Sequence, residues 1–267
     1  MNNFAPPSRL VTSATTGSRV DMLSPQSWRL TIPHGEAGRY RLAQLDDYKK
    51  LPRRQFPWQP PLSLALKCRA SAHPIPGTWG FGLWNDPFSL ALLKGAEALR
   101  LPVMPNAIWF FFASPPNYLS LRDDLPAQGC LAATFRSPTW PAALLALGAP
   151  VLPLLAVPPL VRLLRRWGRR IVLQDAAALE MDPTDWHACC LEWQAGEARF
   201  LVDGGPILHT TVAPRGPLGL VIWVDNQYMS ASPDGQLRFG TLPGPQPAWI
   251  EIKDLQITAL DNHSTSV

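Results

Sequence analysis

The sequence predicts an all-β protein built as an antiparallel β-sandwich or barrel. Thirty prolines and eighteen glycines are spread over 267 residues, and this density of turn formers suits many short strands better than long helices. Segments that alternate between apolar and polar residues recur at roughly 8–12-residue spacing, with turn signals between them. Hydrophobic residues make up 46% of the chain, which is enough for a sizeable core.

The chain length fits one sandwich domain, which we expect over residues 21–262 after a flexible N-terminal segment of residues 1–20. That first segment is rich in Ser, Thr, Pro and Gly and lacks the apolar core of a signal peptide. The four cysteines show no CxxC spacing, so we expect buried free thiols, no metal site, no cofactor and a reducing, cytoplasmic compartment. A net charge of +4 without a basic tract that interleaves with aromatics argues against nucleic acid as a partner.

Alternation and turn boundaries predict the strands of the N-terminal half. They are expected over residues 28–32, 38–43, 62–71, 79–88, 105–113 and 129–135. Residues 46–59 are charged and contain prolines, which favours a surface loop. The strand over 62–71 has an apolar face and a polar face with Lys67 and Arg69, which is either solvated or lines a ligand site. Residues 105–113 are apolar on both faces and indicate a central buried strand.

The C-terminal third has the clearest strand pattern. Strands are expected over residues 186–193, 198–202, 206–212, 218–226 and 248–257. Asp203-Gly204-Gly205 predicts a tight hairpin turn, because glycine accepts the positive φ that such a turn requires.

One segment lacks the strand pattern and predicts a partly helical insertion around residues 138–180. Residues 137–161 carry no charge, but prolines interrupt them, so a lone membrane-spanning helix would leave backbone carbonyls unsatisfied in lipid. The arginine-rich segment that follows resembles an interfacial anchor, so a peripheral membrane contact through residues 138–170 is one of two interpretations. The alternative is a helical flap on the sandwich with solvated arginines. The predicted membrane-contact residues are Arg165, Arg166, Trp167, Arg169 and Arg170.

Three segments together resemble the concanavalin A-like jelly roll, in particular glycoside hydrolase family 16 (laminarinase- and glucanase-type proteins). They are LKCRA (66–70) with GTWGFGLW (77–84), WHACCLEW (186–193) with RFLVDG (199–204), and the closing strand WIEIKDLQI (249–257). The resemblance implies a jelly-roll sandwich over about residues 63–257 with a large insertion.

The resemblance does not extend to the family's catalytic motif. That motif, E-x-D-x-E, supplies the two carboxyls that retaining hydrolysis needs at roughly 5–5.5 Å from each other. The corresponding strand in this chain, residues 106–114, has the sequence NAIWFFFAS and contains no carboxylate. Ordinary family-16 hydrolysis is therefore not expected.

Two predicted strands each place a tryptophan two residues before an aspartate, Trp84 with Asp86 and Trp223 with Asp225. Because residues two apart share one face of a strand, each pair could present an aromatic platform beside a carboxyl. A carboxyl held against tryptophan has a raised pKa, which a general acid needs. The alternative is that both aspartates are ordinary turn residues at strand ends.

These observations leave two functional hypotheses. The first is a non-hydrolytic binding protein with a Trp-lined concave cleft for a carbohydrate or a largely apolar ligand. The second is a degenerate family-16 enzyme in which Asp86 and Asp225 act together on a glycoside, a glycolipid or a lipid-soluble substrate. The partner would be a small molecule, a sugar or a lipid-like ligand, in the cytoplasm with or without membrane association. The predicted ligand-contacting residues are Trp79, Trp84, Trp109, Trp223, Lys67, Arg69, Asn226 and Tyr228.

Overall fold

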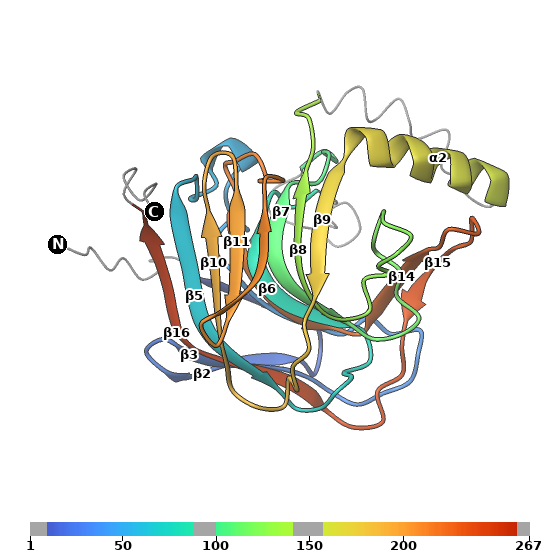
Figure 1. Cartoon of the computed structure of the whole chain (residues 1–267). Coiled ribbons are helices and arrows are strands. Elements are labelled where there is room, and N and C mark those ends of the chain that lie inside the picture. Colours follow the sequence, from blue (N-terminus) through green and yellow to red (C-terminus); the bar gives the residue numbers. More distant parts are fainter. Residues whose placement is uncertain (1–9, 88–99, 141–156, 261–267) are drawn as a thin grey trace.

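The computed structural model describes residues 10–87, 100–140 and 157–260, and its body is a sandwich of two seven-stranded antiparallel sheets (Figure 1). Sheet A contains, in spatial order, β1 (Val11–Ala14), β4 (Leu42–Asp46), β13 (Gly219–Asp225), β6 (Thr78–Trp84), β7 (Ala107–Ala113), β8 (Gly129–Arg136) and β9 (Leu173–Ala178). Sheet B contains β12 (Gly205–Thr210), β11 (Ala198–Val202), β10 (His187–Trp193), β5 (Leu62–Ala70), β16 (Ala248–Ala259), β3 (Ser27–Ile32) and β2 (Arg19–Ser24).

Three short elements lie outside the two sheets. They are the 3₁₀ turn η1 (Arg53–Gln55), the helix α2 (Pro158–Ile171), and a hairpin of β14 (Gln227–Ala231) with β15 (Leu237–Thr241). The antiparallel sandwich that the sequence predicts is confirmed, and its two large sheets fit an all-β jelly-roll sandwich.

One apolar core fills the space between the sheets. The alternation within each strand produces it, because every second side chain points to the partner sheet. Strand β6 contributes Phe81 and Leu83, and β10 contributes Leu191 and Trp193, all of them almost completely buried. Burial of a side chain of this size contributes about 1.5–3 kcal/mol. The remaining positions of sheet A face away from sheet B, and they form the surface on which the candidate site is built.

The structure corrects two predictions of chain organisation. The flexible segment predicted over residues 1–20 contains β1, whose Val11 pairs with Asp46 of β4, while residues 1–9 lie outside the described part. The predicted insertion contains α2, but it also contains β9, which pairs with β8 at the edge of sheet A. Strand β9 is missed because its sequence, LQDAAA, has no regular alternation between apolar and polar residues.

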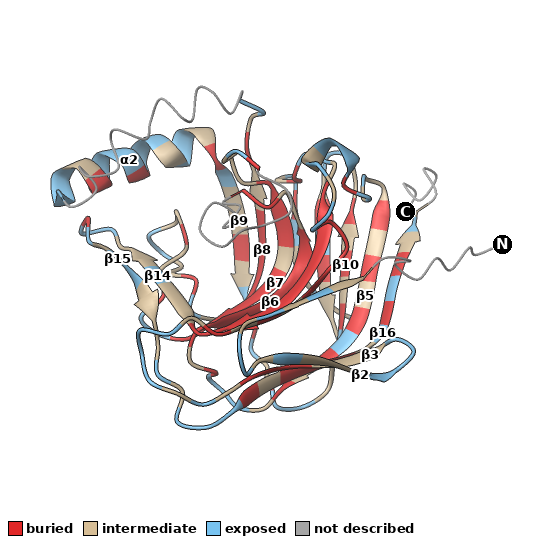
Figure 2. Ribbon diagram, turned by 180° about the vertical axis from the view of Figure 1, so that it is seen from behind, coloured by how far each residue is buried: buried red, intermediate tan, exposed pale blue. Residues whose placement is uncertain are grey.

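Helix α2 extends away from the sandwich. In Figure 1 it runs outward from the start of β9 and lies over the hairpin of β14 and β15. Figure 2 shows that most of its residues are exposed or half-buried, whereas the buried residues gather on the strands of the two sheets. No helix in the described ranges is long and apolar enough to cross a membrane. Residues 141–156 of the predicted insertion lie outside the described part.

The cysteines are free thiols, as the sequence predicts. Cys68, Cys130 and Cys189 are buried and Cys190 is half-buried. Burial raises the pKa of Cys130 to about 12, so this thiol stays protonated and unreactive at neutral pH. Within the described residues, no group of three or more His, Cys, Asp or Glu side chains could hold a metal ion.

Candidate functional site

A continuous tract of aromatic rings lies on the face of sheet A that points away from sheet B. Trp109 of β7 is at its centre, with the ring centroids of Trp84 and Trp223 at 6.0 and 5.6 Å. Phe111 and Phe135 extend the tract at 5.7 and 6.0 Å from Trp109. These separations lie in the range in which aromatic pairs attract each other. We call these five residues the aromatic tract.

Two glycines of β6 allow the indoles to lie close to the sheet. A Cβ atom on Gly80 would be 2.4 Å from the carbonyl oxygen of Phe110 and 2.9 Å from Cη2 of Trp223. A Cβ atom on Gly82 would be 2.5 Å from Cβ of Trp109. Glycine is therefore required at both positions, because the backbone of β7 and, at Gly80, the ring of Trp223 occupy the space that a larger side chain would fill.

The aromatic tract ends at Asp225, a buried carboxyl on the last residue of β13. Thr78 Oγ1 donates a hydrogen bond to Asp225 Oδ1 at 2.8 Å, and the backbone N–H of Gln227 donates to the same atom at 3.2 Å. The hydroxyl of Tyr40 donates to Oδ2 at 3.4 Å. The indole N–H of Trp223 donates to Thr78 Oγ1 at 3.0 Å. The threonine hydroxyl thus connects the aromatic tract to the carboxyl.

Asp225 forms no ion pair with any residue in the described part of the chain. Burial raises its pKa to about 7, although the hydrogen bonds from Thr78 and Gln227 act in the opposite direction. A carboxyl with this pKa exists in both protonation states near neutral pH, so it can either donate or accept a hydrogen bond. A buried carboxyl whose pKa is raised in this way is a candidate functional group.

Asp86 lies at the other end of β6 and does not meet Asp225. Antiparallel register places Thr78 opposite Asp225 and Trp84 opposite Gly219. Trp84, which precedes Asp86, is therefore six residues, or about 20 Å, along the strand from the position opposite Asp225. Asp86 follows Trp84 by two residues. Glycosidases place their two carboxyls roughly 5–9.5 Å apart. The hypothesis of joint catalysis by Asp86 and Asp225 is therefore wrong.

The surroundings of Asp86 also differ from those of Asp225. Arg100 Nη1 donates to Asp86 Oδ2 at 2.5 Å, and this guanidinium is itself buried. The same guanidinium lies 5.5 Å from the ring centroid of Tyr48, whose hydroxyl accepts a hydrogen bond from the indole of Trp84 at 2.7 Å. Asp86 thus belongs to a closed ion pair with Arg100.

Trp79 and Asn226 were predicted to contact a ligand, and the structure contradicts both predictions. Trp79 points into the core between the sheets, where its ring stacks on Phe112 at a centroid distance of 3.5 Å. Asn226 is buried, and its amide bonds the backbone of Arg41 and of Leu242 at 2.8 and 2.9 Å. Trp79 is an even number of residues from Phe81 and Leu83, the core residues of β6, so it shares their face of the strand. Trp84 is on the opposite face.

Lys67 and Arg69 lie on the outer face of sheet B, on the far side of the sandwich from the aromatic tract. Lys67 pairs with Asp254 at 3.1 Å, and Arg69 pairs with Glu251 at 2.7 Å. The structure therefore does not bring them to the same site as the tryptophans. Tyr228 lies on β14, outside sheet A, where its ring packs over Gly240.

The predicted membrane-contact residues divide into two groups. Arg165 is buried and is held by the carbonyls of Ser120 and Leu121, so it does not lie on the exposed surface of the helix, and its prediction as a membrane-contact residue is wrong. Arg169 also donates to Leu121. The exposed members are Arg166, Trp167, Arg169 and Arg170.

Sequence reasoning missed the polar partners of Asp225 and the rings beside the tryptophans. Thr78 becomes a partner of Asp225 only through the antiparallel register, which no spacing in the sequence reveals. Tyr40 reaches the site from the loop before β4. The two glycines of β6, alternating with bulky residues, were the one available signal of a close approach by large side chains.

The fold and the site together define the class of protein: it is a jelly-roll sandwich with an aromatic tract on the outer face of sheet A, next to a buried aspartate. No protein-family model matches the chain, and no curated protein matches it. Among solved structures, a legume lectin-like domain from Entamoeba histolytica is similar at 9% identity and a TM-score of 0.46, over 95% of this chain and 91% of its own.

Two glucan-related structures are similar to the same degree. A Bacteroides ovatus family-16 protein, in complex with a mixed-linkage glucan product, matches 96% of this chain and 96% of its own at 10% identity and a TM-score of 0.46. Bacillus licheniformis β-glucanase matches 95% of this chain and 99% of its own at 9% identity and a TM-score of 0.43. At these identities the likeness concerns the fold alone.

Proposed function

We propose that this protein is a non-hydrolytic binding protein that holds a carbohydrate on the aromatic tract of sheet A. The observation that carries the proposal is the position of the half-buried indoles of Trp84 and Trp109 beside the buried Trp223, which Thr78 connects to Asp225. Asp225 is a buried carboxyl that has no ion pair in the described residues. Indole faces suit the C–H faces of a sugar ring, and a few convergent polar groups orient such a ligand. The competing ligand class is a largely apolar molecule, which would use the rings alone.

Binding without hydrolysis is supported by the residues of β7. Its outward positions are Ala107, Trp109, Phe111 and Ala113, so the strand that the sequence resemblance matches to the family-16 catalytic strand presents aromatic rings and no carboxylate. Hydrolysis requires a second carboxyl within about 10 Å of the first. Asp86, the second carboxyl of the enzyme hypothesis, is bound by Arg100 at the far end of β6.

The test replaces one ring of the tract and one matched tryptophan elsewhere. Trp109→Ala is expected to weaken binding of linear glucan oligosaccharides at least tenfold in isothermal titration calorimetry, because it removes the central stacking surface. Trp249→Ala, on the outer face of sheet B, is the control and should leave the affinity unchanged. Near-ultraviolet circular dichroism verifies that both variants fold. Equal affinities of folded Trp109→Ala and the parent protein would refute the proposal.

Asp225→Asn distinguishes the two ligand classes. A sugar that hydrogen-bonds to the carboxylate should bind about tenfold more weakly to this variant, because a bond to a charged group contributes roughly 1.5 kcal/mol or more. A long-chain alcohol, used as the apolar probe, should bind the variant and the parent protein equally. If only the alcohol binds, and Trp109→Ala abolishes its binding, the apolar ligand is the correct class.

We also propose that the protein works in the cytoplasm and makes a peripheral membrane contact through the region of α2. Three large apolar side chains of this helix support the contact, since Leu163, Leu164 and Trp167 are 45%, 38% and 60% exposed. Co-sedimentation of the full chain with lipid vesicles tests it.

A further inference from the structure

Helix α2 presents two parallel rows of side chains to solvent. Leu163 and Trp167 are four residues apart and form an apolar row, and Arg162, Arg166 and Arg170 form a neighbouring basic row at the same spacing. Soluble proteins rarely leave large apolar side chains together on one exposed helix face. A basic row beside a row of Leu and Trp is the pattern of helices that lie in a membrane interface.

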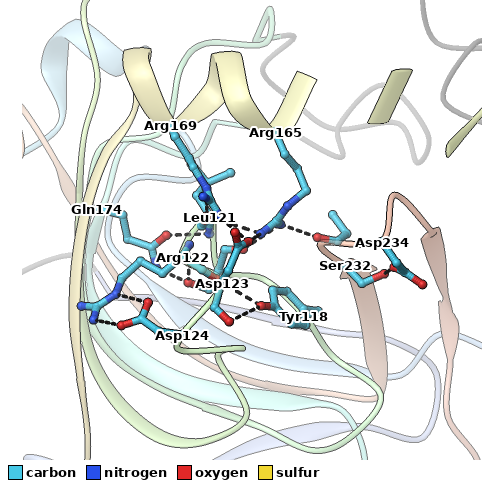
Figure 3. A network of polar contacts seen from close by, with 12 residues as sticks. Tyr118, Leu121, Arg122, Asp123, Asp124, Arg165, Arg169, Gln174, Ser232 and Asp234 are labelled. Carbon is cyan, nitrogen blue, oxygen red and sulfur yellow. Dashed lines mark hydrogen bonds and ion pairs between the residues drawn. The ribbon is translucent and has the colours of Figure 1, made fainter. Parts of the chain in front are cut away.

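Arginine side chains, together with the buried Val161, fasten α2 to the rest of the protein. Arg165 Nη1 donates to the carbonyl of Ser120 at 2.9 Å, and Arg165 Nη2 donates to Asp123 Oδ1 at 2.9 Å (Figure 3). Near the start of the helix, Arg162 Nη1 donates to the carbonyl of Asp234 at 2.9 Å. The helix is therefore held through its polar side, which leaves its apolar row free to contact another surface.

A cavity of about 130 Å³ lies on this polar side, between α2, the loop after β7 and the tip of the β14–β15 hairpin. The residues that line it are Asp123, Arg162, Arg165, Arg166, Arg169 and Pro233. Four guanidinium groups thus face one carboxylate, whose pKa is lowered chiefly by the hydrogen bond from Arg169. The cavity consequently has an excess of positive charge.

Arg166 is the arginine of the cavity that is free to bind a ligand. It makes no hydrogen bond and no ion pair with any residue in the part of the chain that the structure describes. One guanidinium group can donate two parallel hydrogen bonds to the oxygens of a phosphate, in a planar geometry that lysine does not offer. Arg166 also belongs to the basic row that borders Leu163 and Trp167, so an anion in the cavity would lie beside the apolar row.

We propose that this cavity binds the phosphate of an anionic phospholipid headgroup while Leu163 and Trp167 enter the bilayer interface. The inference rests on the proposed membrane contact and names the lipid class and the residues that recognise it. Charge complementarity selects an anionic lipid, because the cavity and the row of Arg162, Arg166 and Arg170 are all cationic. Tryptophan prefers the headgroup level of a bilayer, which is where Trp167 would lie.

The experiment measures co-sedimentation of the full chain with phosphatidylcholine vesicles, with and without added phosphatidylglycerol. Added phosphatidylglycerol should increase binding, and high salt should weaken it. Arg166→Ser with Arg170→Ser should lower the partition coefficient about 25-fold, since each arginine near an anionic surface contributes about fivefold. The control is Lys50→Ser with Arg54→Ser, which removes two exposed charges outside α2 and should change binding much less.

Two further variants separate a headgroup site from general attraction. Arg166→Lys keeps the charge but loses the paired hydrogen bonds, so it should weaken binding severalfold if the cavity recognises phosphate. Trp167→Ser should weaken binding to all vesicles, whereas Leu23→Ser, which changes an exposed residue of β2, should not. A variant that loses its folded circular dichroism spectrum is replaced by the milder Trp167→Gln.

The possible outcomes distinguish the proposed membrane contact from the proposed headgroup site. No sedimentation with any vesicle would overturn the membrane contact and the headgroup site together. Equal sedimentation with both vesicle types, unaffected by Arg166→Lys, would leave the contact standing and overturn the headgroup site. Calorimetric binding of inorganic phosphate that depends on Arg166, without any vesicle binding, would assign the cavity to a soluble phosphate and overturn the lipid.

Discussion

Asp225 and Glu251 are both buried carboxyl groups beside a tryptophan, on the outer faces of the two sheets. Glu251 is 3% exposed and accepts hydrogen bonds from Arg29 at 2.6 Å and from Arg69 at 2.7 Å. Both guanidinium groups also lie over the ring of Trp249, at 4.7 and 5.6 Å from its centroid. Asp225 is 7% exposed and receives hydrogen bonds only from neutral donors.

The difference arises from strand register. Glu251 stands directly opposite Arg29 on β3 and Arg69 on β5, so a cation flanks it on both sides. Asp225 stands opposite Thr78 on β6 and Leu42 on β4, neither of which carries charge. A tryptophan two residues from an acidic residue therefore belongs to a closed ionic cluster on sheet B, whereas on sheet A the acid has no charged partner among the described residues. Asp225 thus differs from Glu251 in the charge of its partners, which are all neutral among the described residues.

The largest expected effect comes from Asp225→Asn. Burial raises the folded-state pKa of Asp225 from 3.8 to about 7, so the folded protein binds this proton more tightly than the unfolded chain does. The stability that this proton contributes is complete below about pH 4 and is lost as the pH rises through about pH 7. A shift of this size corresponds to about 4 kcal/mol. Asp225→Asn should therefore unfold at higher urea concentration than the parent protein at about pH 8.

The control for this prediction is the pH dependence itself. At about pH 4 the parent carboxyl is protonated and resembles the amide, so the two proteins should have nearly equal free energies of unfolding. Asp47, whose pKa burial also raises, to about 6, remains in both proteins and cancels in the difference. A loss of stability in Asp225→Asn at about pH 8 would mean that Asp225 has a cationic partner.

The second prediction addresses the closed cluster. Glu251→Gln leaves the guanidinium groups of Arg29 and Arg69 without their carboxylate, and the loss of one partner from a buried pair costs about 3–5 kcal/mol. Both arginines are about one-third exposed, so water compensates for part of this and we expect about 2–3 kcal/mol. Urea unfolding at neutral pH measures it. A gain of stability would show that Glu251 resembles Asp225 after all.

The comparison also shows how far the sequence alone reaches. Alternation predicts strands such as Ala198–Val202, because one face of each strand must enter the core. It predicts that Trp223 and Asp225 share a face, since two residues on one strand determine that. It fails for Asp86 and Asp225, because their separation depends on which end of β6 meets which end of β13.

Strand register and the contacts between distant segments of the chain are the information that the sequence lacks. Trp79 and Trp84 look equivalent in a Trp-rich strand, but an odd separation of five residues puts them on opposite faces. Arg165 looks equivalent to Arg166 in an arginine-rich segment, yet among the described residues only Arg165 of the two is hydrogen-bonded to the loop after β7. In both cases the composition predicts the kind of surface, and contacts with neighbouring elements of the same chain determine which residue belongs to it.

The third prediction concerns the packing of the aromatic tract. In Gly80→Ala the new methyl group would meet the carbonyl oxygen of Phe110 and the ring of Trp223, and the backbone oxygen cannot move away cheaply. Such overpacking costs typically about 1–3 kcal/mol. Chemical denaturation measures the loss. Gly196→Ala is the matched control, because no atom lies within 4 Å of the added methyl group there, and its stability should match that of the parent protein.

The smallest effect is expected from Thr78→Val, which removes the hydroxyl between Trp223 and Asp225. The indole N–H loses its acceptor and the carboxyl loses a donor, at a cost of about 1–3 kcal/mol, near the lower end if water enters. Because the bond from Thr78 lowers the pKa of Asp225, its removal should raise that pKa further. The pH at which stability falls should then move upward.

Thr31→Val is the counterpart on sheet B. Thr31 stands opposite Trp249, and its buried hydroxyl has no hydrogen-bond partner in the described part of the chain. Replacing an unsatisfied hydroxyl by a methyl group of the same shape should be neutral or stabilising. Urea unfolding of both variants across the pH range compares them. If Thr31→Val lost as much stability as Thr78→Val, the hydroxyl of Thr78 would have no special part in holding Asp225, and the aromatic tract would end at an ordinary buried acid.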